Sequence, residues 1–348
     1  MRAILLTRTG RLEDTPLELR DVPMPVPAAD EILIKVSACG VCHTELDEIE
    51  GRTPPPKLPV VPGHQVVGTV AAVGPKQSSI SNPESRMLQV GARVGVAWIF
   101  SACGKCDYCR SGQENLCPDF KATGRDVNGG YAEYMTVPAA FAHPITSAFS
   151  DVEAAPLLCA GAVGYRSLRL TNIKDGQSLG LTGFGASGHL VLKTARYLHP
   201  NTRVHVFARS KEEQGFAREL GATWAGDTDD KAPELLDAII DTTPVWKPVV
   251  AALGNLKPGG RLVINAIRKE ETDKQALLGL DYAKHLWMEK EIKSVANVTR
   301  KDVSEFLALA ARIPIKPEVQ EYPLEDANQA LLELKERRIR GAKVLRLG

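Results

Sequence analysis

Four cysteines in one short run constrain this sequence more than any other feature. Residues 103 to 117 read CGKCDYCRSGQENLC, so that two, two and seven residues separate Cys103, Cys106, Cys109 and Cys117. The short C-x-x-C steps let the sulfur atoms converge on one ion, and four thiolates complete a closed tetrahedral zinc site. An iron–sulfur cluster uses similar spacings and remains an alternative. The intervening residues are polar and cannot form a core, so we expect this lobe to fold only around its metal.

The compartment decides how clustered cysteines are used. The N-terminus has too short an apolar run for a secretory signal, and no later run approaches a membrane span, so we expect a cytoplasmic protein. Thiols stay reduced there, and clustered cysteines bind metals rather than form disulfides. The total of seven cysteines is odd, which also argues against complete pairing. A net charge of +1 gives no reason to expect a nucleic acid or a membrane as partner.

A second group of metal-ligand residue types begins in residues 39 to 68. Cys42 and His64 offer a thiolate and an imidazole, which suit a tetrahedral metal with one open position. Two ligands do not complete a site, and a core thiol or a surface imidazole is the simpler interpretation of each. Cys159 is a candidate third ligand. It lies in an Ala- and Leu-rich stretch that predicts a helix capped by Asp151, where a cysteine is ordinarily a packing residue.

The hydrophobic pattern divides the chain into two kinds of structure, and 348 residues suggest two domains. Alternating apolar residues predict antiparallel strands, at residues 3–6, 32–36, 66–73, 92–97 and from 128 onward. Strands then alternate with helices, at 177–182, 186–198, 204–207, 212–220, 238–241, 247–256 and 261–266, which predicts a parallel doubly wound sheet. The chain ends with a strand at 292–296, helices at 303–311 and 324–336, and a strand at 342–347.

The segment GFGASG joins the first strand of that sheet to the first helix. Gly183, Gly185 and Gly188 form the pattern G-x-G-x-x-G in the context that gives it meaning. Such glycines allow a tight turn and a close approach of backbone N–H groups to a pyrophosphate. The sequence therefore predicts a dinucleotide site here.

The end of the second strand distinguishes the two nicotinamide cofactors. An NAD-binding sheet usually places an acidic residue there to hold the ribose 2′-hydroxyl. Here Ala208 takes that place, followed by Arg209, Ser210 and Lys211, which suit a 2′-phosphate. We therefore expect NADP(H) to be preferred, with NAD(H) possible. Alternatively, Arg209 and Lys211 form an ordinary solvated helix start with two neighbouring glutamates.

The order of these motifs resembles that of the zinc-containing alcohol dehydrogenases of the medium-chain dehydrogenase/reductase superfamily. The resemblance covers nearly the whole chain, through GVCHTE, PGHQVVG, CGKCDYC with Cys117, GGYAEY, PLLCAGAVGY, GFGASG, PGGRLV and IRGAKVL. It implies an α/β plus β-rich protein. Residues 1–155 and 297–348 would form a GroES-like catalytic domain, with the metal lobe at about 98–118. Residues 156–296 would be an inserted Rossmann nucleotide-binding domain, with the active site between the two domains.

The resemblance also implies roles for individual residues. Cys42, His64 and Cys159 would bind a catalytic zinc, and the four cysteines of the lobe a structural zinc, so that only Cys39 has no role. Thr44 resembles the hydroxyl that passes the alcohol proton toward the cofactor ribose. His43 resembles the residue that contacts the cofactor pyrophosphate.

Five further positions bear on the substrate pocket and on proton release. Trp98 matches a pocket-lining position, although a core tryptophan is an equally open interpretation. Ile49 replaces a bulky aromatic residue of some relatives, which implies a roomier pocket. Gln65 and Glu45 stand where the family usually has Glu and Asp. Asp47 replaces the histidine that in many members hands the proton to solvent, and its carboxylate could accept that proton with a different pH dependence.

These residues together predict a zinc-dependent alcohol dehydrogenase or aldehyde reductase that acts on primary alcohols and their aldehydes. A polyol or secondary-alcohol dehydrogenase of the same superfamily is an alternative, and a non-catalytic NADP(H)- or zinc-binding protein is a more remote one. The resemblance also implies a homodimer or homotetramer, joined at the sheet edge near Ile292.

Overall fold

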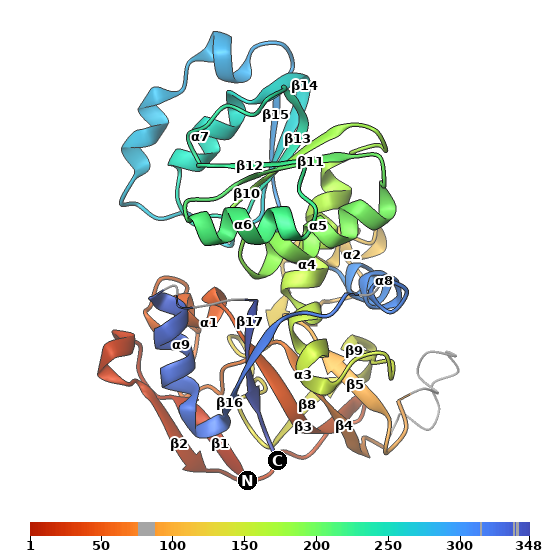
Figure 1. Ribbon diagram of the computed structural model, residues 1–348. Coiled ribbons are helices and arrows are strands. Elements are labelled where there is room, and N and C mark those ends of the chain that lie inside the picture. Colours follow the sequence, from red (N-terminus) through yellow and green to blue (C-terminus); the bar gives the residue numbers. More distant parts are fainter. Residues whose placement is uncertain (76–87, 314, 337, 339–340) are drawn as a thin grey trace. The chain divides into compact units, whose positions relative to one another are not determined.

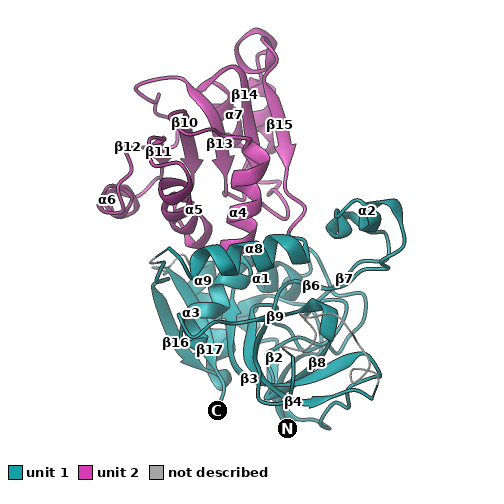
Figure 2. Ribbon diagram, turned by 90° about the vertical axis from the view of Figure 1, so that its right-hand side faces the viewer, with its two compact units in different colours: residues 1–159, 298–348 teal, residues 160–297 magenta. Residues whose placement is uncertain are grey.

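A computed structural model describes residues 1–75, 88–313, 315–336, 338 and 341–348 (Figure 1). The chain separates into two compact units, which Figure 2 colours separately: Met1–Cys159 with Val298–Gly348, and Ala160–Asn297. The sequence places these limits at residues 155 and 297, and the roles of the units as catalytic and nucleotide-binding domains remain predictions. Ile339 and Arg340 of the IRGAKVL motif lie outside the described residues. None of the described helices is long and apolar enough to cross a membrane.

A seven-stranded sheet forms the centre of the first unit. Its long strand β3 (Glu31–Val41) pairs with three neighbours, and Ile32, Ile34 and Val36 are buried along it. The order is β16 (Val319–Pro323), β17 (Ala342–Arg346), β3, β4 (Val66–Val73), β5 (Arg93–Val96) and β9 (Ala142–Pro144), with β8 (Tyr134–Pro138) also on β3. Among the described residues of this sheet, β16 and β17 pair in parallel and the other neighbouring strands pair antiparallel.

Smaller elements surround this sheet. Two antiparallel pairs are formed by β1 (Arg2–Leu6) with β2 (Leu17–Asp21) and by β6 (Ile99–Ser101) with β7 (Lys121–Ala122). The helices of the unit are α1 (His43–Ile49), α2 (Asp107–Arg110), α3 (Asp151–Ala154), α8 (Arg300–Ala310) and α9 (Ala327–Lys335).

The second unit is a parallel sheet of six strands. Their order is β12 (Trp224–Gly226), β11 (Arg203–Phe207), β10 (Ser178–Thr182), β13 (Leu236–Asp241), β14 (Leu256–Ile264) and β15 (Glu291–Ser294). The strand order reverses between β10 and β13, the switch point at which doubly wound sheets bind ligands. This confirms the doubly wound parallel sheet that the sequence predicts.

Helices cover both faces of the parallel sheet. Helices α5 (Ala186–Leu198) and α6 (Lys211–Glu219) lie on one side and α7 (Lys247–Leu253) on the other (Figure 1). Residues of α7 such as Val249 and Leu253 belong to one buried cluster with Ile239 of β13 and Leu262 of β14. Burial on both faces explains why β10 has no exposed residue and shows no alternation.

Asp151 is not the cap that the sequence predicts. Ser150 caps α3 instead, because its Oγ accepts a hydrogen bond from the Glu153 N–H at 3.3 Å. Asp151 is the first residue of the helix, and its carboxylate accepts hydrogen bonds from Ser37 and Arg93. Distant partners thus decide the role of an acidic residue that the local pattern marks as a cap.

Cys159 does not lie within a helix. The predicted helix breaks into α3, a 3₁₀ turn (Ala155–Leu158) and α4 (Ala160–Thr171), and Cys159 lies at the junction with φ −126° and ψ −79°. Pro156 lies in the first turn of the 3₁₀ segment, as its fixed φ and missing N–H allow. The break gives Cys159 a backbone conformation that a continuous helix would not.

Candidate active site and metal centres

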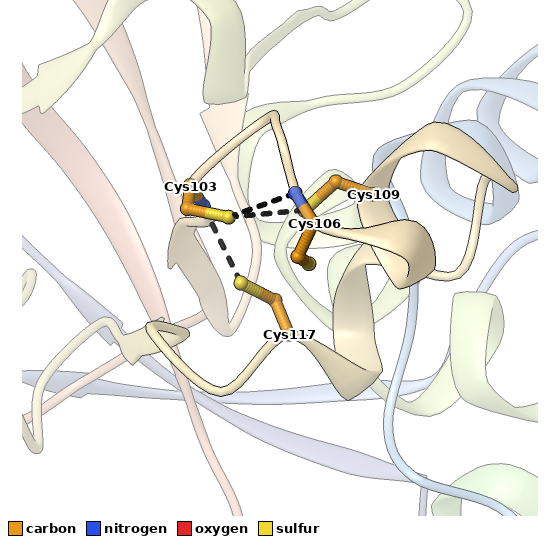
Figure 3. A group of neighbouring side chains, drawn as sticks. All are labelled: Cys103, Cys106, Cys109 and Cys117. Carbon is orange, nitrogen blue, oxygen red and sulfur yellow. Dashed lines mark hydrogen bonds between the residues drawn. The ribbon is translucent and has the colours of Figure 1, made fainter.

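The four cysteines of the lobe converge around one point. Their sulfur atoms all lie within 4.8 Å of one another, and Figure 3 shows the side chains turned toward a common centre. Backbone N–H groups also point at the sulfurs: the N–H of Cys106 donates to Cys103 Sγ, and the N–H of Cys103 to Cys117 Sγ, each at 3.4 Å. The residues between the ligands form α2 and a 3₁₀ turn, Glu114–Leu116. The arrangement fits a tetrahedral ion with only sulfur ligands.

Cys103 and Cys109 of the lobe differ in acidity. Hydrogen bonds from the backbone N–H groups of Lys105 and Cys106 lower the pKa of Cys103 to about 6. Burial, followed by hydrogen bonds to the neighbouring thiols, raises the pKa of Cys109 to about 12. A divalent ion bound at this point would keep thiols of such different acidity ionised together.

Glu114 fastens the lobe to helix α8. Its carboxylate accepts hydrogen bonds from the Arg300 backbone N–H at 2.8 Å and from the Arg300 Nε and Nη2 at 3.0 and 2.7 Å. The Cys117 N–H in turn donates to the Glu114 carbonyl oxygen at 3.1 Å. A lobe ligand is therefore three residues away from a charge-assisted anchor at a helix N-terminus.

Three segments far apart in the sequence bring the second set of ligands together. Cys42 follows β3 and begins α1, His64 precedes β4, and Cys159 lies before α4. Their ligand atoms lie within 4.8 Å of one another, with Cys42 Sγ at 3.7 Å from His64 Nε2. The site thus offers two thiolates and one imidazole, which is the ligand set of a catalytic zinc with an open fourth position.

Glu45 orients His64 from the side away from the thiols. His64 Nδ1 lies 2.5 Å from Glu45 Oε1, and the Cys42 N–H donates to Glu45 Oε2 at 3.0 Å. A proton on Nδ1 leaves Nε2 available as the ligand atom. Burial alone would lower the pKa of His64, but the charges of Glu45 and Cys42 raise it well above its usual value. The donor set of two sulfurs and one imidazole, with a carboxylate behind it, fits a bound cation.

The first turns of α1 carry the other predicted site residues. Thr44 is buried, and its backbone N–H donates to Cys42 Sγ at 3.3 Å, whereas His43 is exposed. The carboxylate of Asp47 accepts a hydrogen bond from Arg52 Nε at 2.6 Å. Sequence analysis gave no role to Arg52, and its position five residues after Asp47 is not a helical pairing that would have indicated one. Ile49 is completely buried.

Glu48 is the third buried carboxyl group of α1, after Glu45 and Asp47, and sequence analysis did not identify it. Its side chain is on α1, and only 2% of the residue is exposed. Burial, followed by the charge of Glu45, raises the pKa of Glu48 well above its usual value. The spacing of three residues from Glu45 could have indicated that both lie on one face of a helix.

Two other predicted positions contact the protein interior. The ring of Trp98 is half-buried and lies 4.8 Å from the ring of Phe120. The side chain of Gln65 packs on the backbone of Gly40, where an added Cβ would lie only 2.7 Å from its Cδ. Both interpretations of Trp98, as a pocket residue or a core residue, are compatible with these contacts.

The three glycines after β10 differ in what surrounds them. Gly183 has a φ of +80°, and a Cβ there would lie 2.8 Å from Thr242 Oγ1. A Cβ on Gly188 would lie 2.8 Å from the Gly183 carbonyl oxygen, but one on Gly185 would meet nothing within 4 Å. The turn thus needs its first and third glycines for conformation and packing, and its second leaves the backbone open to a ligand.

The segment after β11 offers positive charge at the surface. Ala208 is buried and Arg209 is exposed. Ser210 caps α6 by accepting a hydrogen bond from the Glu213 N–H at 3.0 Å, and Lys211 Nζ donates to Gln214 Oε1 at 3.1 Å. Within the described part of the chain, Arg209 and Lys211 form no ion pair with Glu212 or Glu213.

Comparison with known proteins shows the family to which the chain belongs. The model of the alcohol dehydrogenase GroES-like domain matches residues 28–147. The chain is 44% identical over 345 residues to the Mycobacterium tuberculosis protein named "Probable alcohol dehydrogenase AdhA", which covers 99% of this chain and 97% of that protein. It is 35% identical over 340 residues to an alcohol dehydrogenase of Geobacillus stearothermophilus. That match covers 95% of this chain and 96% of the Geobacillus protein. The chain belongs to the zinc-dependent alcohol dehydrogenases of the medium-chain dehydrogenase/reductase superfamily.

The fold of this alcohol dehydrogenase also matches solved structures. The chain superimposes on a cobalt- and zinc-bound thermostable alcohol dehydrogenase from Pyrobaculum aerophilum with a TM-score of 0.84 and 25% sequence identity. The superposition covers 100% of this chain and 99% of the P. aerophilum chain. The GroES-like domain with an inserted Rossmann sheet, as the sequence predicts, is therefore confirmed.

Replacing Glu45 should weaken one metal site and leave the other intact. Glu45→Gln removes the charge that orients His64, so we expect zinc affinity at the Cys42–His64–Cys159 site to fall roughly 10- to 100-fold. Elemental analysis after dialysis against a chelator should find two zinc ions per subunit in the wild-type enzyme and one in the variant. Glu48→Gln, on the same helix, is the matched control and should keep both ions. Equal zinc retention by the wild-type protein and Glu45→Gln would contradict the role of Glu45.

Proposed function

We propose that this alcohol dehydrogenase is a zinc- and NADP(H)-dependent enzyme that interconverts primary alcohols and their aldehydes. The observation that supports it most is the convergence of Cys42, His64 and Cys159 next to Thr44 on α1. Two thiols, an imidazole and a buried carboxylate fit a divalent cation, and the lobe would bind a second zinc. The P. aerophilum relative, whose structure holds cobalt and zinc, supports the same metal chemistry.

The residues of the chain would divide the work of the reaction. Bound zinc would polarise the alcohol or aldehyde oxygen, and the nicotinamide ring would accept or return the hydride. Cys42, His64 and Cys159 would hold the ion, and Glu45 would keep His64 in the tautomer that leaves Nε2 to the metal. His43 would contact the cofactor pyrophosphate, as the family resemblance implies.

Proton release would run along α1. Thr44 would take the hydroxyl proton of the alcohol and pass it toward the cofactor ribose. Asp47, three residues later, would be the next acceptor. Asp47 forms an ion pair with Arg52, which also pairs with Glu50 and is partly exposed. The guanidinium is already protonated, so Asp47 itself would have to hand the proton to solvent. An aspartate that pairs with arginine would therefore replace the histidine that many family members use.

Removing the Thr44 hydroxyl should stop turnover but not cofactor binding. We expect Thr44→Ala to lower kcat by about 10²- to 10⁴-fold, because the alcohol proton loses its acceptor. The cofactor Kd, measured by fluorescence titration, should stay unchanged. Thr44→Ser keeps a hydroxyl and should retain activity. A Thr44→Ala variant with full turnover would refute the relay, and a wild-type protein with no turnover would favour the non-catalytic alternative.

The preference for NADP(H) rests on the segment after β11. Arg209 is exposed and lies directly after Ala208, where no carboxylate repels a 2′-phosphate. We expect Arg209→Ala to weaken NADPH binding about tenfold or more, since a charge-assisted hydrogen bond is lost. Binding of NADH, which lacks the phosphate, should not change. Steady-state kinetics that show a clear preference of the wild-type enzyme for NAD(H) would overturn this assignment.

The substrate class follows from the pocket positions that the family resemblance gives. Trp98 and Ile49 would line the pocket, with Ile49 leaving room for aromatic or medium-length alcohols. Activity profiling against primary, secondary and polyol substrates separates this proposal from the two enzyme alternatives. A higher kcat/KM for polyols or secondary alcohols would replace the primary-alcohol assignment.

The free edge of the parallel sheet supports a homo-oligomer. All residues of β15 are exposed, and hydrophobic side chains lie exposed on it and just before it, Tyr282, Trp287, Met288 and Ile292 among them. An exposed edge strand offers unpaired N–H and C=O groups to another copy. We propose a homodimer, or a homotetramer built from such dimers, in the cytoplasm. A one-subunit mass in sedimentation would contradict it.

A further inference from the structure

The carboxyl ends of the central strands of the parallel sheet form one row. Thr182 at the end of β10 is in register with Phe207 of β11 and with Asp241 of β13, and Asp241 with Ile264 of β14. The glycine turn follows Thr182, and Arg209 follows Phe207 closely. In a sheet of this order the pyrophosphate lies at the glycine turn and the adenosine half beside β11. The loops after β13 and β14 therefore face the remaining half, the nicotinamide mononucleotide.

A buried ion pair holds these two loops. Lys269 follows β14, and its Nζ donates to the carboxylate of Asp241 and to the carbonyl oxygens of Thr243 and Val245, at 2.7 and 3.2 Å for the carbonyls. The side chain of Asp241 is completely buried, and that of Lys269 is 7% exposed. An ammonium group has three protons, and these acceptors account for all of them. Lys269 therefore holds the loops rather than a ligand.

Backbone hydrogen bonds join the same two loops at further points. The Glu270 N–H donates to the Pro244 carbonyl oxygen at 2.7 Å. The carboxylate of Asp273 accepts from the N–H groups of Trp246 and Lys247, both at 2.8 Å. We call residues 242–247 and 265–273 together the nicotinamide platform. It is one connected piece.

The platform adjoins the glycine turn and contains an unsatisfied donor. The Thr242 N–H and Oγ1 donate to the Thr182 carbonyl oxygen at 2.9 and 3.0 Å, and Thr242 Oγ1 fills the space beside Gly183. Asn265 Nδ2 is buried and has no hydrogen-bond partner among the described residues. Such a buried donor is costly to leave unpaired, but its burial keeps it out of reach of a bound ligand.

We propose that Asp241 and Lys269 are a positioning pair for the nicotinamide half of the cofactor. This inference rests on the proposed function, because it requires that the chain bind a nicotinamide dinucleotide. Two buried charges are satisfied only while the loops keep this arrangement, so the pair selects one conformation of the platform. Without it, the loops that face the nicotinamide relax, while the adenosine side at β11 keeps its own contacts.

Two ligands of the full-length enzyme distinguish the halves of the site. NADPH spans both, and 2′,5′-ADP contains only the phosphorylated adenosine half. We expect Lys269→Met to raise the Kd for NADPH about tenfold and to leave the Kd for 2′,5′-ADP unchanged. Lys257→Met is the matched control, because Lys257 pairs with Asp237 at 2.8 Å between the same two strands at their opposite ends. It should change neither Kd. If the wild-type enzyme prefers NADH, the probes are NADH and ADP.

A second measurement and a second variant distinguish a loss of positioning from a loss of folding. Lys269→Met leaves the buried carboxylate of Asp241 without its cationic partner, and circular dichroism shows whether the variant folds. The double variant Asp241→Asn, Lys269→Met has no stranded charge and should show the same selective loss of NADPH affinity. Equal loss of both ligands in a folded variant, or no loss of either, overturns the positioning role. A wild-type protein that binds neither NADPH nor NADH overturns the proposed function instead.

Discussion

The buried negative charge around His64 is the constraint on which the first unit depends. Glu45 is completely buried, and two thiols lie on the other side of the imidazole. Isolated buried charge is costly, and a cation between the thiols and the imidazole would offset the charge of Glu45. Zinc would be that cation, at the point where the end of β3, the loop before β4 and the junction before α4 meet. Metal binding and the packing of these segments would then be a single event.

The four cysteines of the lobe, unlike Cys42, His64 and Cys159, lie close together in the sequence. Its ligands are local, so the C-x-x-C spacing alone predicts the site, and polar residues between the cysteines need no core. Its position on the unit is not local, because Glu114 binds Arg300, 186 residues later in the chain. The Arg300 guanidinium also lies 4.5 Å from the centre of the Phe141 ring. One carboxylate therefore connects a metal-dependent lobe to a helix near the end of the chain.

This contrast explains how much the sequence could predict. Local patterns gave β4 and α5 with their observed limits, because apolar periodicity and the glycine turn are short-range signals. The cap at Ser150 and the broken helix before Cys159 were missed, since the partners of Asp151 are distant residues. Motif order brought Cys42, His64 and Cys159 together correctly in space. Glu48, Arg52 and Lys269 have no motif, and only the folded chain shows what they contact.

Burial separates the charged residues of this chain by the free-energy cost of placing them where they lie. Exposed pairs such as Lys274 with Glu271 contribute little and can lie anywhere on the surface. Glu45, Glu48 and Asp241 are different, because each is at most 2% exposed and carries a desolvation cost that apolar residues would avoid. Two of them lie on α1, and the third ends β13, the strand beside β10 and its glycine turn. The proposed function places the zinc and the cofactor beside these three carboxyl groups, which would give the fold a reason to retain their desolvation cost.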